Sequence, residues 1–427
     1  MQFASSELNA ARELDFQDPL ARFREKFYIA DENTIYLDGN SLGRLPLETM
    51  HIIDSTMRQQ WGTRLIRSWN EDWVRTSRNI GAKIARLIGT REDEVIVADS
   101  TSINLFKLAI AALRAREERT KIVSDDLNFP SDLYILQGII ELLNDKHHLV
   151  RIPSADGMTI PHQSIQNNID EDTALVSLTH VSFKYASMYD MAAVTELVHS
   201  AGALMLWDLS HSAGAVPLAL SDWGVDLAVG CTYKYLNGGP GSPAYLYVKR
   251  DLQDKLHSPI WGWFGARQPF DFNLDYEPAN GLDRFLSGTP AILSMKAIEP
   301  ALDIILEAGM ENLRRKSILQ TEYLIYLADQ RLASLDFETA SPRNADVRGS
   351  HIALKHPEAY RINRAMIEAA PPAVCVIPDF RAPDIIRLGA APLYNTFEEI
   401  YLAIDRIKTI VEDNVYQQYS KEMLAVT

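Results

Sequence analysis

Lys234 stands between two tyrosines in the segment CTYKYLNGGPGS, after an apolar run and before three glycines within four residues. Lysine is ordinarily a solvated surface residue, so an exposed strand end followed by a turn would account for the pattern. Burial at a strand end would instead lower the pKa of the amine and make it a usable nucleophile. The segment alone leaves both interpretations open.

Polar residues also follow two other apolar runs. Asp208 ends the run LMLWD and His211 comes three residues later. Asp208 could be a catalytic carboxylate or could cap the next turn, and a lone histidine is commonly structural. Hydroxyl residues 100–102 separate the run EVIVAD from the helical pattern INLFKLAIAALR. Hydroxyls and free N–H groups at a helix start suit a phosphate, although a simple N-cap has the same composition.

These three groups are more specific together than apart. In open α/β sheets, ligands bind beyond the carboxyl ends of the strands, where all three groups would lie. A strand-end lysine, a carboxylate and a phosphate cradle are what pyridoxal phosphate (PLP) requires, because the lysine binds its aldehyde and the acid keeps the pyridine nitrogen protonated. An unrelated nucleotide-binding α/β protein is the competing interpretation.

Short apolar runs alternate with helical patterns over most of the chain, which is typical of βαβ units with a parallel sheet. After about residue 335 the pattern changes to shorter strands and helices. The sequence therefore predicts a large α/β domain with a mainly parallel sheet wrapped by helices, followed by a smaller C-terminal α+β domain. Strands are expected at residues 94–99, 121–124, 174–178, 204–208, 227–230, 351–354, 374–378 and 385–389, and helices at 103–114, within 290–335, at 361–369 and at 396–413.

Composition excludes several classes of protein. The 427 residues carry a net charge of −15, which disfavours nucleic-acid or anionic-membrane surfaces. Cys231 and Cys375 are too few for a disulfide framework, and no HExxH pair or close His/Cys group suggests a metal. No secretory signal and no long apolar run appears, so a cytoplasmic protein without a membrane span is expected. No GxGxxG follows an early strand, which disfavours a nicotinamide dehydrogenase.

Several segments together resemble the kynureninase family over nearly the whole chain, from about residue 18 to 413. They are YLDGNSLG at 36–43, NFPSD at 128–132, DLSH at 208–211, CTYKYLNGGPGS, GWFG at 262–265, Arg387, and APLYN at 391–395. Kynureninases are homodimeric PLP enzymes of fold type I, the aspartate-aminotransferase-like fold. They hydrolyse the Cβ–Cγ bond of L-kynurenine or 3-hydroxykynurenine to an anthranilate and alanine, in tryptophan catabolism and NAD biosynthesis.

The resemblance implies a role for each matching position. Lys234 would bind PLP covalently, Asp208 would pair with the pyridine nitrogen, and Tyr233 would hold the phosphate and relay protons. Arg387 would clamp the substrate carboxylate. The further residues implied are Thr101 and Ser102 for the phosphate, Asp132, Thr179 and His211 along the cofactor, Trp263 and Thr289 reaching the neighbouring subunit's site, and Ser41 and Trp69 for the substrate. Trp69 could equally be a core aromatic.

The chain departs from the family pattern at three places. Ala266 stands where histidine commonly follows GWFG, Tyr185-Ala186 replaces a Thr-Gly pair, and Tyr189 replaces a histidine. These positions bear on the substrate, so a ring-modified kynurenine or another γ-keto amino acid is the alternative. A lyase, desulfurase or aldol-type enzyme is a wider alternative, but neither cysteine lies in a context that suits a desulfurase. A non-catalytic binding protein is disfavoured by the intact Lys234 and Asp208.

The domain boundaries expected from these patterns are an N-terminal segment at 1–45 that packs with the small domain, a large PLP-binding domain at 46–300, and the small domain at 301–427. The resemblance further implies that two subunits share their active sites.

Overall fold

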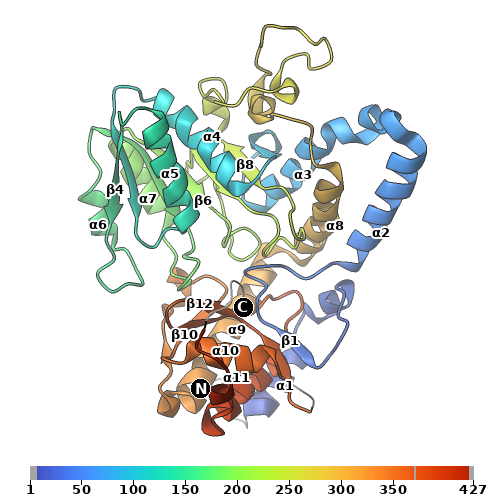
Figure 1. Ribbon diagram of the computed structural model, residues 1–427, viewed down its shortest axis with the longest axis vertical. Helices are drawn as coiled ribbons and strands as arrows, with labels where there is room; N and C mark the ends of the chain where they lie inside the picture. Colours follow the sequence, from blue (N-terminus) through green and yellow to red (C-terminus); the bar gives the residue numbers. More distant parts are fainter. Residues whose placement is uncertain (1–6, 370–371, 423–427) are drawn as a thin grey trace.

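The computed structural model describes residues 7–369 and 372–422, which form two packed bodies. A seven-stranded sheet with helices on both sides makes the larger body, and a four-stranded antiparallel sheet with helices makes the smaller one (Figure 1). Among the described residues, no helix is both long and apolar enough to cross a membrane.

The large sheet has the strand order β2-β8-β7-β6-β5-β3-β4. Strand β8 pairs antiparallel with both of its neighbours, whereas the other pairs are parallel. The carboxyl ends of the remaining six strands therefore meet at one edge. The bounds are β2 (Val95–Val97), β3 (Lys121–Asp125), β4 (His148–Ile152), β5 (Thr173–Thr179), β6 (Leu204–Asp208), β7 (Leu227–Gly230) and β8 (Tyr245–Val248).

Alternation along the strands divides the large body into two cores, because successive side chains point to opposite faces of a sheet. In β6, Met205 and Trp207 join one core, while Leu204 and Leu206 join the other. The first core is covered by α3 (Val74–Leu87), α7 (Met191–Ser200) and α8 (Ile292–Ala308), and the second by α4 (Thr101–Arg114) and α5 (Pro130–Leu142). Both faces are thus covered, which explains why these strands are apolar without interruption.

The small body is built on the sheet β12-β13-β10-β9, all of whose pairs are antiparallel. One apolar cluster joins this sheet to its helices, including Ile386 of the sheet and Ile404 of the last long helix. The bounds are β9 (Glu338–Thr339), β10 (Ile352–Lys355), β12 (Asp379–Arg381), β13 (Ile385–Leu388), α9 (Met310–Arg331), α10 (Ala359–Ile367) and α11 (Phe397–Glu412). Thr396 and Glu399 form the capping box at the start of α11.

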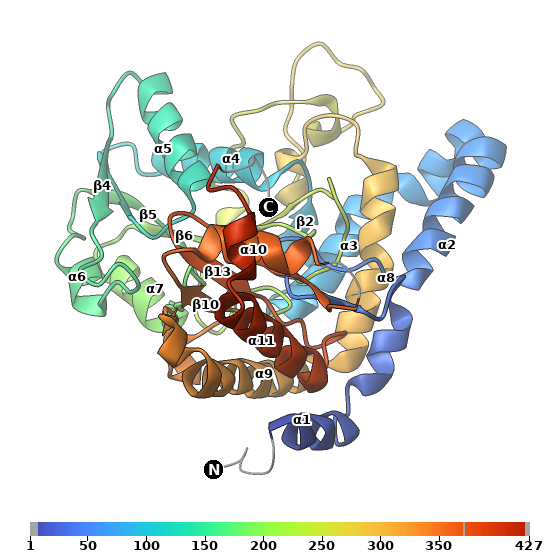
Figure 2. The same ribbon diagram turned by 60° about the horizontal axis from the view of Figure 1, so that its bottom comes forward.

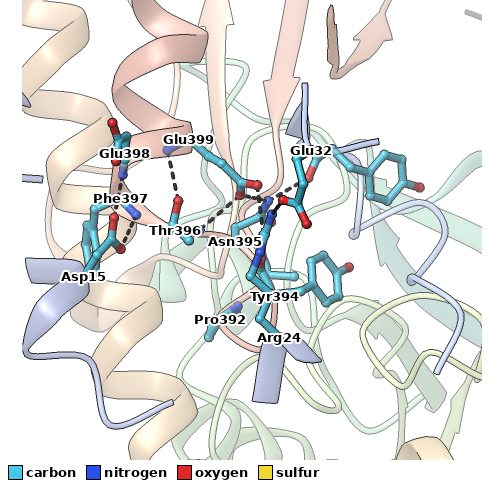
Figure 3. A network of polar contacts seen from close by, with 12 residues as sticks. Asp15, Arg24, Glu32, Pro392, Tyr394, Asn395, Thr396, Phe397, Glu398 and Glu399 are labelled. Atoms are coloured by element: carbon cyan, nitrogen blue, oxygen red, sulfur yellow. Dashed lines mark hydrogen bonds and ion pairs between the residues drawn. The ribbon is translucent and has the colours of Figure 1, made fainter. Parts of the chain in front are cut away.

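The beginning of the chain folds with its end. Helix α1 (Glu7–Phe16) lies against α11 (Figure 2), and β1 (Thr34–Tyr36) pairs in parallel with β11 (Cys375–Ile377). Figure 3 shows the polar contacts of this junction, in which the Asp15 carboxylate accepts hydrogen bonds from the N–H groups of Phe397 and Glu398 at 2.7 and 2.9 Å. A carboxylate at a helix N-terminus stabilises it by satisfying free N–H groups.

A helical arm and a long loop project from the large body (Figure 1). The arm contains α2 (Leu47–Ser55), a wider helical stretch over Thr56–Arg64 and another over Trp69–Trp73. The loop follows the short helix Trp263–Gly265. Both carry exposed apolar side chains, including Trp61, Ile66, Phe272 and Leu274. The large body also contains the short helix α6 (His162–Gln166).

Candidate active site

A cavity of about 150 Å³ lies at the carboxyl edge of the large sheet. Its walls come from the segments that follow β2, β3, β6 and β7, and from the segment that enters β8. The lining residues are Ser100, Thr101, Ser102, Phe129, Ser131, Asp132, Asp208, Ser210, His211, Tyr233, Lys234, Ser242 and Ala244. The cavity therefore brings together the lysine, the carboxylate and the hydroxyl run that the sequence singled out.

Lys234 lies in the loop between β7 and β8. Its Nζ is 3.5 Å from Nδ1 of His211 and 5.8 Å from the centre of the Phe129 ring. Gly43 packs against the backbone of this loop, and its N–H donates to the Tyr233 carbonyl at 2.8 Å. A Cβ on Gly43 would collide with the Lys234 carbonyl oxygen and with Asn237. The glycine of the N-terminal motif is thus required for the close approach that holds the lysine loop.

Asp208 is buried at the end of β6 and accepts hydrogen bonds from the N–H and hydroxyl of Ser210 at 2.8 and 2.6 Å. Burial raises its pKa, and the nearby Lys234 amine opposes that rise. Asp132 lies at the start of α5, where burial and the Asp208 charge together raise its pKa well above the usual range. Two buried carboxyl groups near one amine thus lie together, and the raised pKa of Asp132 favours its protonated form.

The hydroxyl run closes the cavity at the start of α4. Ser100 is the N-cap, and its side chain accepts from the Ile103 N–H at 3.4 Å. Thr101 and Ser102 are the first helical residues, and the Ser102 hydroxyl lies 3.0 Å from that of Ser131. The run therefore caps the helix and also presents hydroxyls to the cavity. A helix start with free N–H groups favours an anion at this end of the cavity.

The lining residues fit PLP by the chemistry of their donors and acceptors. The Asp132 Oδ2 and the His211 Nε2 are buried without a hydrogen-bond partner among the described residues. Both atoms can therefore form a hydrogen bond with a bound cofactor. A carboxylate for the ring nitrogen, an amine for the aldehyde and hydroxyls for the phosphate line one space. Across the ranges that the structure describes, no group of three or more His, Cys, Asp or Glu residues could hold a metal ion.

Arg387 lies on β13 of the small body, buried and facing the large one. Its guanidinium donates to the Ser41 hydroxyl at 2.8 Å, to the Phe183 carbonyl and to Asp379, with which it forms a buried ion pair. Burial lowers its pKa to about 10. Arg387 and Ser41, which the sequence assigned to the substrate, are therefore in direct contact, and three separate segments hold the guanidinium in place.

Besides Ser41 and Arg387, four residues assigned from the sequence lie outside the cavity lining. Thr179 ends β5 beside Asp208 in the sheet and donates its hydroxyl hydrogen to the Asn128 side chain. Trp69 packs against Trp73 and Phe264, at ring distances of 5.4 and 5.6 Å. The other two are Trp263, 4.5 Å from Phe264 in the same aromatic cluster, and Thr289, in a surface groove of about 530 Å³ that Trp73 also lines. Trp69 thus has the packing of a half-buried aromatic residue.

Several residues of this site have no assignment from the sequence. Phe129 and Ser131 lie inside the segment NFPSD, and Ser210 inside DLSH, so the motifs could have indicated them. Asp379 could not be found this way, because nothing in the sequence shows that β12 pairs with β13 and brings it to Arg387.

Two of the three departures from the family pattern lie in one loop beside Arg387. Ala186 has a φ of +62°, a left-handed conformation that suits the glycine otherwise common there. The Tyr189 hydroxyl donates to Asp125 at 2.6 Å. The same loop supplies the Phe183 carbonyl that Arg387 contacts. Ala266 lies instead in the projecting loop, bridged to Pro278 and away from the cavity.

Comparison with solved structures shows the same architecture. A cysteine desulfurase from Thermococcus onnurineus NA1 matches with a TM-score of 0.77 and 19% identity over 93% of this chain and 99% of its own. A C-DES variant solved with glycine covalently linked to the PLP cofactor matches with a TM-score of 0.75 and 18% identity, over 88% of this chain and 97% of its own. The chain therefore has the fold type I architecture that the family resemblance implied.

Comparison of sequences is more specific. A family profile described as the kynureninase C-terminal domain matches residues 313–407. A kynureninase from Pseudomonas fluorescens is 43% identical over 410 residues, which cover 95% of both chains, and one from Burkholderia mallei (strain SAVP1) is 42% identical over 409 residues with the same coverage. Since this similarity extends over almost the full length of the chain, the chain belongs to the kynureninase family.

Proposed function

We propose that this chain is a PLP-dependent hydrolase that converts L-kynurenine and water to anthranilate and L-alanine. The observation that carries the proposal is near-full-length similarity to kynureninases in a chain that also gathers the lysine, the carboxylates and the hydroxyl cradle around one cavity. We also propose that the chain hydrolyses 3-hydroxykynurenine and that it acts in tryptophan catabolism and NAD biosynthesis.

PLP, when bound, supplies an electron sink for the bonds that break next to the amino-acid carbon. Asp208, buried and held by Ser210, pairs with the ring nitrogen and keeps it protonated. Lys234 would hold the cofactor through its amine, and the same amine, when free, would accept the substrate's α-proton. Thr101 and Ser102 hold the phosphate with Tyr233, and Asp132, Thr179 and His211 lie along the ring.

Arg387 and Ser41 bind the substrate α-carboxylate in this proposal. The planar guanidinium suits a bidentate contact with a carboxylate, and the ion pair with Asp379 fixes its orientation. Burial raises the pKa of Tyr233 above its usual value, so its hydroxyl stays protonated at neutral pH. That hydroxyl, next to Lys234 in the chain, can donate a proton in the later steps.

The proposed function is tested with the purified protein loaded with PLP. Incubation with L-kynurenine should release fluorescent anthranilate and alanine in equal amounts, and 3-hydroxykynurenine should be tested in parallel. Release of neither aryl acid would refute the proposal. Ring-modified kynurenines and simpler γ-keto amino acids belong in the same screen, because the loop with Tyr185 and Ala186 differs from the family pattern beside Arg387.

The chain is further proposed to act as a cytoplasmic homodimer with shared active sites. Trp61 is 59% exposed on the helical arm, and Leu274 is fully exposed on the projecting loop. Exposed apolar patches mark interfaces, and these side chains are proposed to pack against the partner subunit. Sedimentation should give a dimer, which Trp61→Glu weakens. Tyr134→Glu, at an aromatic side chain on α5 that is 67% exposed, is the control, and a monomeric wild-type protein would refute this part.

A further inference from the structure

His351 is a buried histidine that none of the assignments above uses. It immediately precedes β10 in the small body and is fully inaccessible to solvent. No hydrogen bond of ordinary length and angle reaches either ring nitrogen from the described residues, although the Lys184 backbone lies close enough to raise the pKa of His351. A buried imidazole with so little hydrogen bonding is costly, because its nitrogens lose hydrogen bonds to water. Such a group calls for a functional explanation.

Strand pairing places His351 on the face of the small sheet that carries Arg387. Ala353 lies directly opposite Arg387 in the antiparallel pair β10–β13, so the two share a face. His351 is two residues before Ala353, and alternate residues along an extended chain point the same way. Diagonal neighbours on such a pair are about 7–8 Å apart at Cα. His351 is therefore a near neighbour of the proposed carboxylate clamp.

The other side of His351 faces the cofactor cavity. Its ring centre is 5.9 Å from that of His211, whose Nδ1 lies 3.5 Å from the Lys234 amine. Burial lowers the pKa of His351 well below its ordinary value, and Arg387, Lys234 and Arg381 lower it further, while the backbone of Lys184 acts in the opposite direction. The imidazole is thus neutral at neutral pH, with one nitrogen free to accept a proton.

The proposed reaction leaves one task without a residue. Water must add to the γ-carbonyl of the substrate, which lies a short way along the side chain from the carboxylate that Arg387 binds. Lys234 is engaged at the α-carbon, and Asp208 at the ring nitrogen. The water needs a group that accepts a proton as its oxygen attacks, and a neutral imidazole is suited to that work.

We propose that His351 is the general base that holds and deprotonates the water attacking the γ-carbonyl, an inference that rests on the proposed function. The water oxygen bonds to the γ-carbon, the carbonyl electron pair moves onto oxygen, and one water proton moves to the imidazole. The Cβ–Cγ bond then breaks, and its electron pair leaves with the alanine half. The β-carbon must gain one proton to become a methyl group, which balances the proton that His351 took.

Substrate binding favours this transfer. Two cations, Arg387 and Lys234, oppose a positive charge on His351 before substrate arrives. A carboxylate held by Arg387 neutralises part of that charge, so the imidazole becomes a better base once the amino acid is bound. Base strength is thereby coupled to occupancy of the site.

The test compares two reactions of the PLP-loaded His351→Gln variant. Glutamine retains an amide in place of the ring but cannot act as a base. Anthranilate release should fall on the order of 100-fold or more in kcat. Exchange of the α-hydrogen of L-alanine in deuterated water, followed by NMR, depends on Lys234 and should stay near the wild-type rate. Imidazole added to His351→Ala should restore part of the anthranilate release.

His356→Gln is the matched control. His356 is a buried histidine just beyond the other end of β10, and its Nδ1 accepts from the Glu358 N–H at 2.9 Å. The His356→Gln variant should release anthranilate near the wild-type rate. Unchanged cleavage in His351→Gln would overturn the inference, as would an equal fall in α-hydrogen exchange and cleavage.

A second variant covers loss of folding. If His351→Gln fails to bind PLP, His351→Asn is examined in the same way, and failure of both would mean that His351 supports the structure and is no base. A wild-type protein that exchanges the α-hydrogen of alanine but cleaves no kynurenine would refute the proposed function. Wild-type cleavage that His351→Gln retains would refute only the role of His351.

Discussion

The ion pair between Arg387 and Asp379 offers the sharpest test of how the small body contributes to stability and to the proposed site for the substrate carboxylate. Both side chains are almost completely buried, at 1% and 4% exposure. Asp379 also accepts from Arg381 at 2.8 Å and from Ser41 at 3.1 Å. Asp379→Asn keeps the shape of the side chain and removes its charge, so that the buried guanidinium loses its paired carboxylate.

The size of the effect follows from what remains around Arg387. Breaking a buried pair by removing one partner costs about 3–5 kcal/mol, because a buried charge is left uncompensated. Arg387 would retain its hydrogen bonds to the Ser41 hydroxyl and the Phe183 carbonyl. The negative charge of Asp38 also opposes the fall in the pKa of Arg387 that burial causes. We therefore expect the free energy of unfolding to fall by about 3 kcal/mol, the low end of that range.

Urea denaturation of the PLP-loaded protein, with and without L-alanine, measures this effect. A ligand at about 100 times its Kd adds about 2.7 kcal/mol to stability. In Asp379→Asn the alanine carboxylate supplies the charge that the guanidinium has lost, so alanine should stabilise the variant by at least about 1 kcal/mol more than the wild type.

Asp384→Asn is the control for this experiment. Asp384 lies in the turn between β12 and β13, and its carboxylate is 3.9 Å from the partly exposed Lys355 amine. Its loss should change stability by no more than about 0.5 kcal/mol. An Asp379→Asn protein that unfolds at the wild-type urea concentration would show that Asp379 is not the charge that balances Arg387. Equal stabilisation of variant and wild type by alanine would place the carboxylate site elsewhere.

Three further outcomes are expected. Borohydride should trap a cofactor adduct on the wild-type protein, and mass spectrometry should find none on Lys234→Ala. Lys316→Met should lower the free energy of unfolding by about 3–5 kcal/mol, because the buried Asp18 carboxylate 2.7 Å away loses its cation, and adding Asp18→Asn should recover part of that loss. Burial raises the pKa of Asp125 to about 6, above its unfolded value, so its ionisation costs stability as the pH rises through this range. Tyr189→Phe removes a hydrogen bond to the ionised form, so denaturation should show a loss of about 2 kcal/mol at pH 8 and a smaller loss at pH 5; equal losses would contradict this account.

The strands of the large sheet were predictable because they are buried on both faces. The runs at 204–208 and 227–230 were expected with the bounds that the structure gives them, and the run at 174–178 differs by one residue at each end. Uninterrupted apolar runs of this length bounded by polar residues leave little choice of structure. Asp208 and Lys234, at or after the ends of two of these runs, consequently line one cavity, as the sequence predicted.

The order and direction of the strands in the large sheet were harder to predict from the sequence. Strand β8 runs against the others between β2 and β7, and no local pattern distinguishes it from a parallel strand. The wide helical turns over Thr56–Arg64 were not expected either. Contacts between distant segments could not be predicted from the sequence either. Ser41 and Arg387, for example, are in contact although 346 residues separate them. His351, which has no motif around it, emerges only once the pairing of β10 with β13 is known.

The junction between the two chain ends affects how the protein can be made. During synthesis the large sheet emerges early and has most of its partners at hand, whereas β1 and α1 wait for β11 and α11 near the end of the chain. Domains fold as units in the order in which the ribosome releases them. The cavity wall would thus exist while the segment carrying Arg387 is still being translated. A nascent chain could therefore bind its cofactor before the site for the substrate carboxylate is complete.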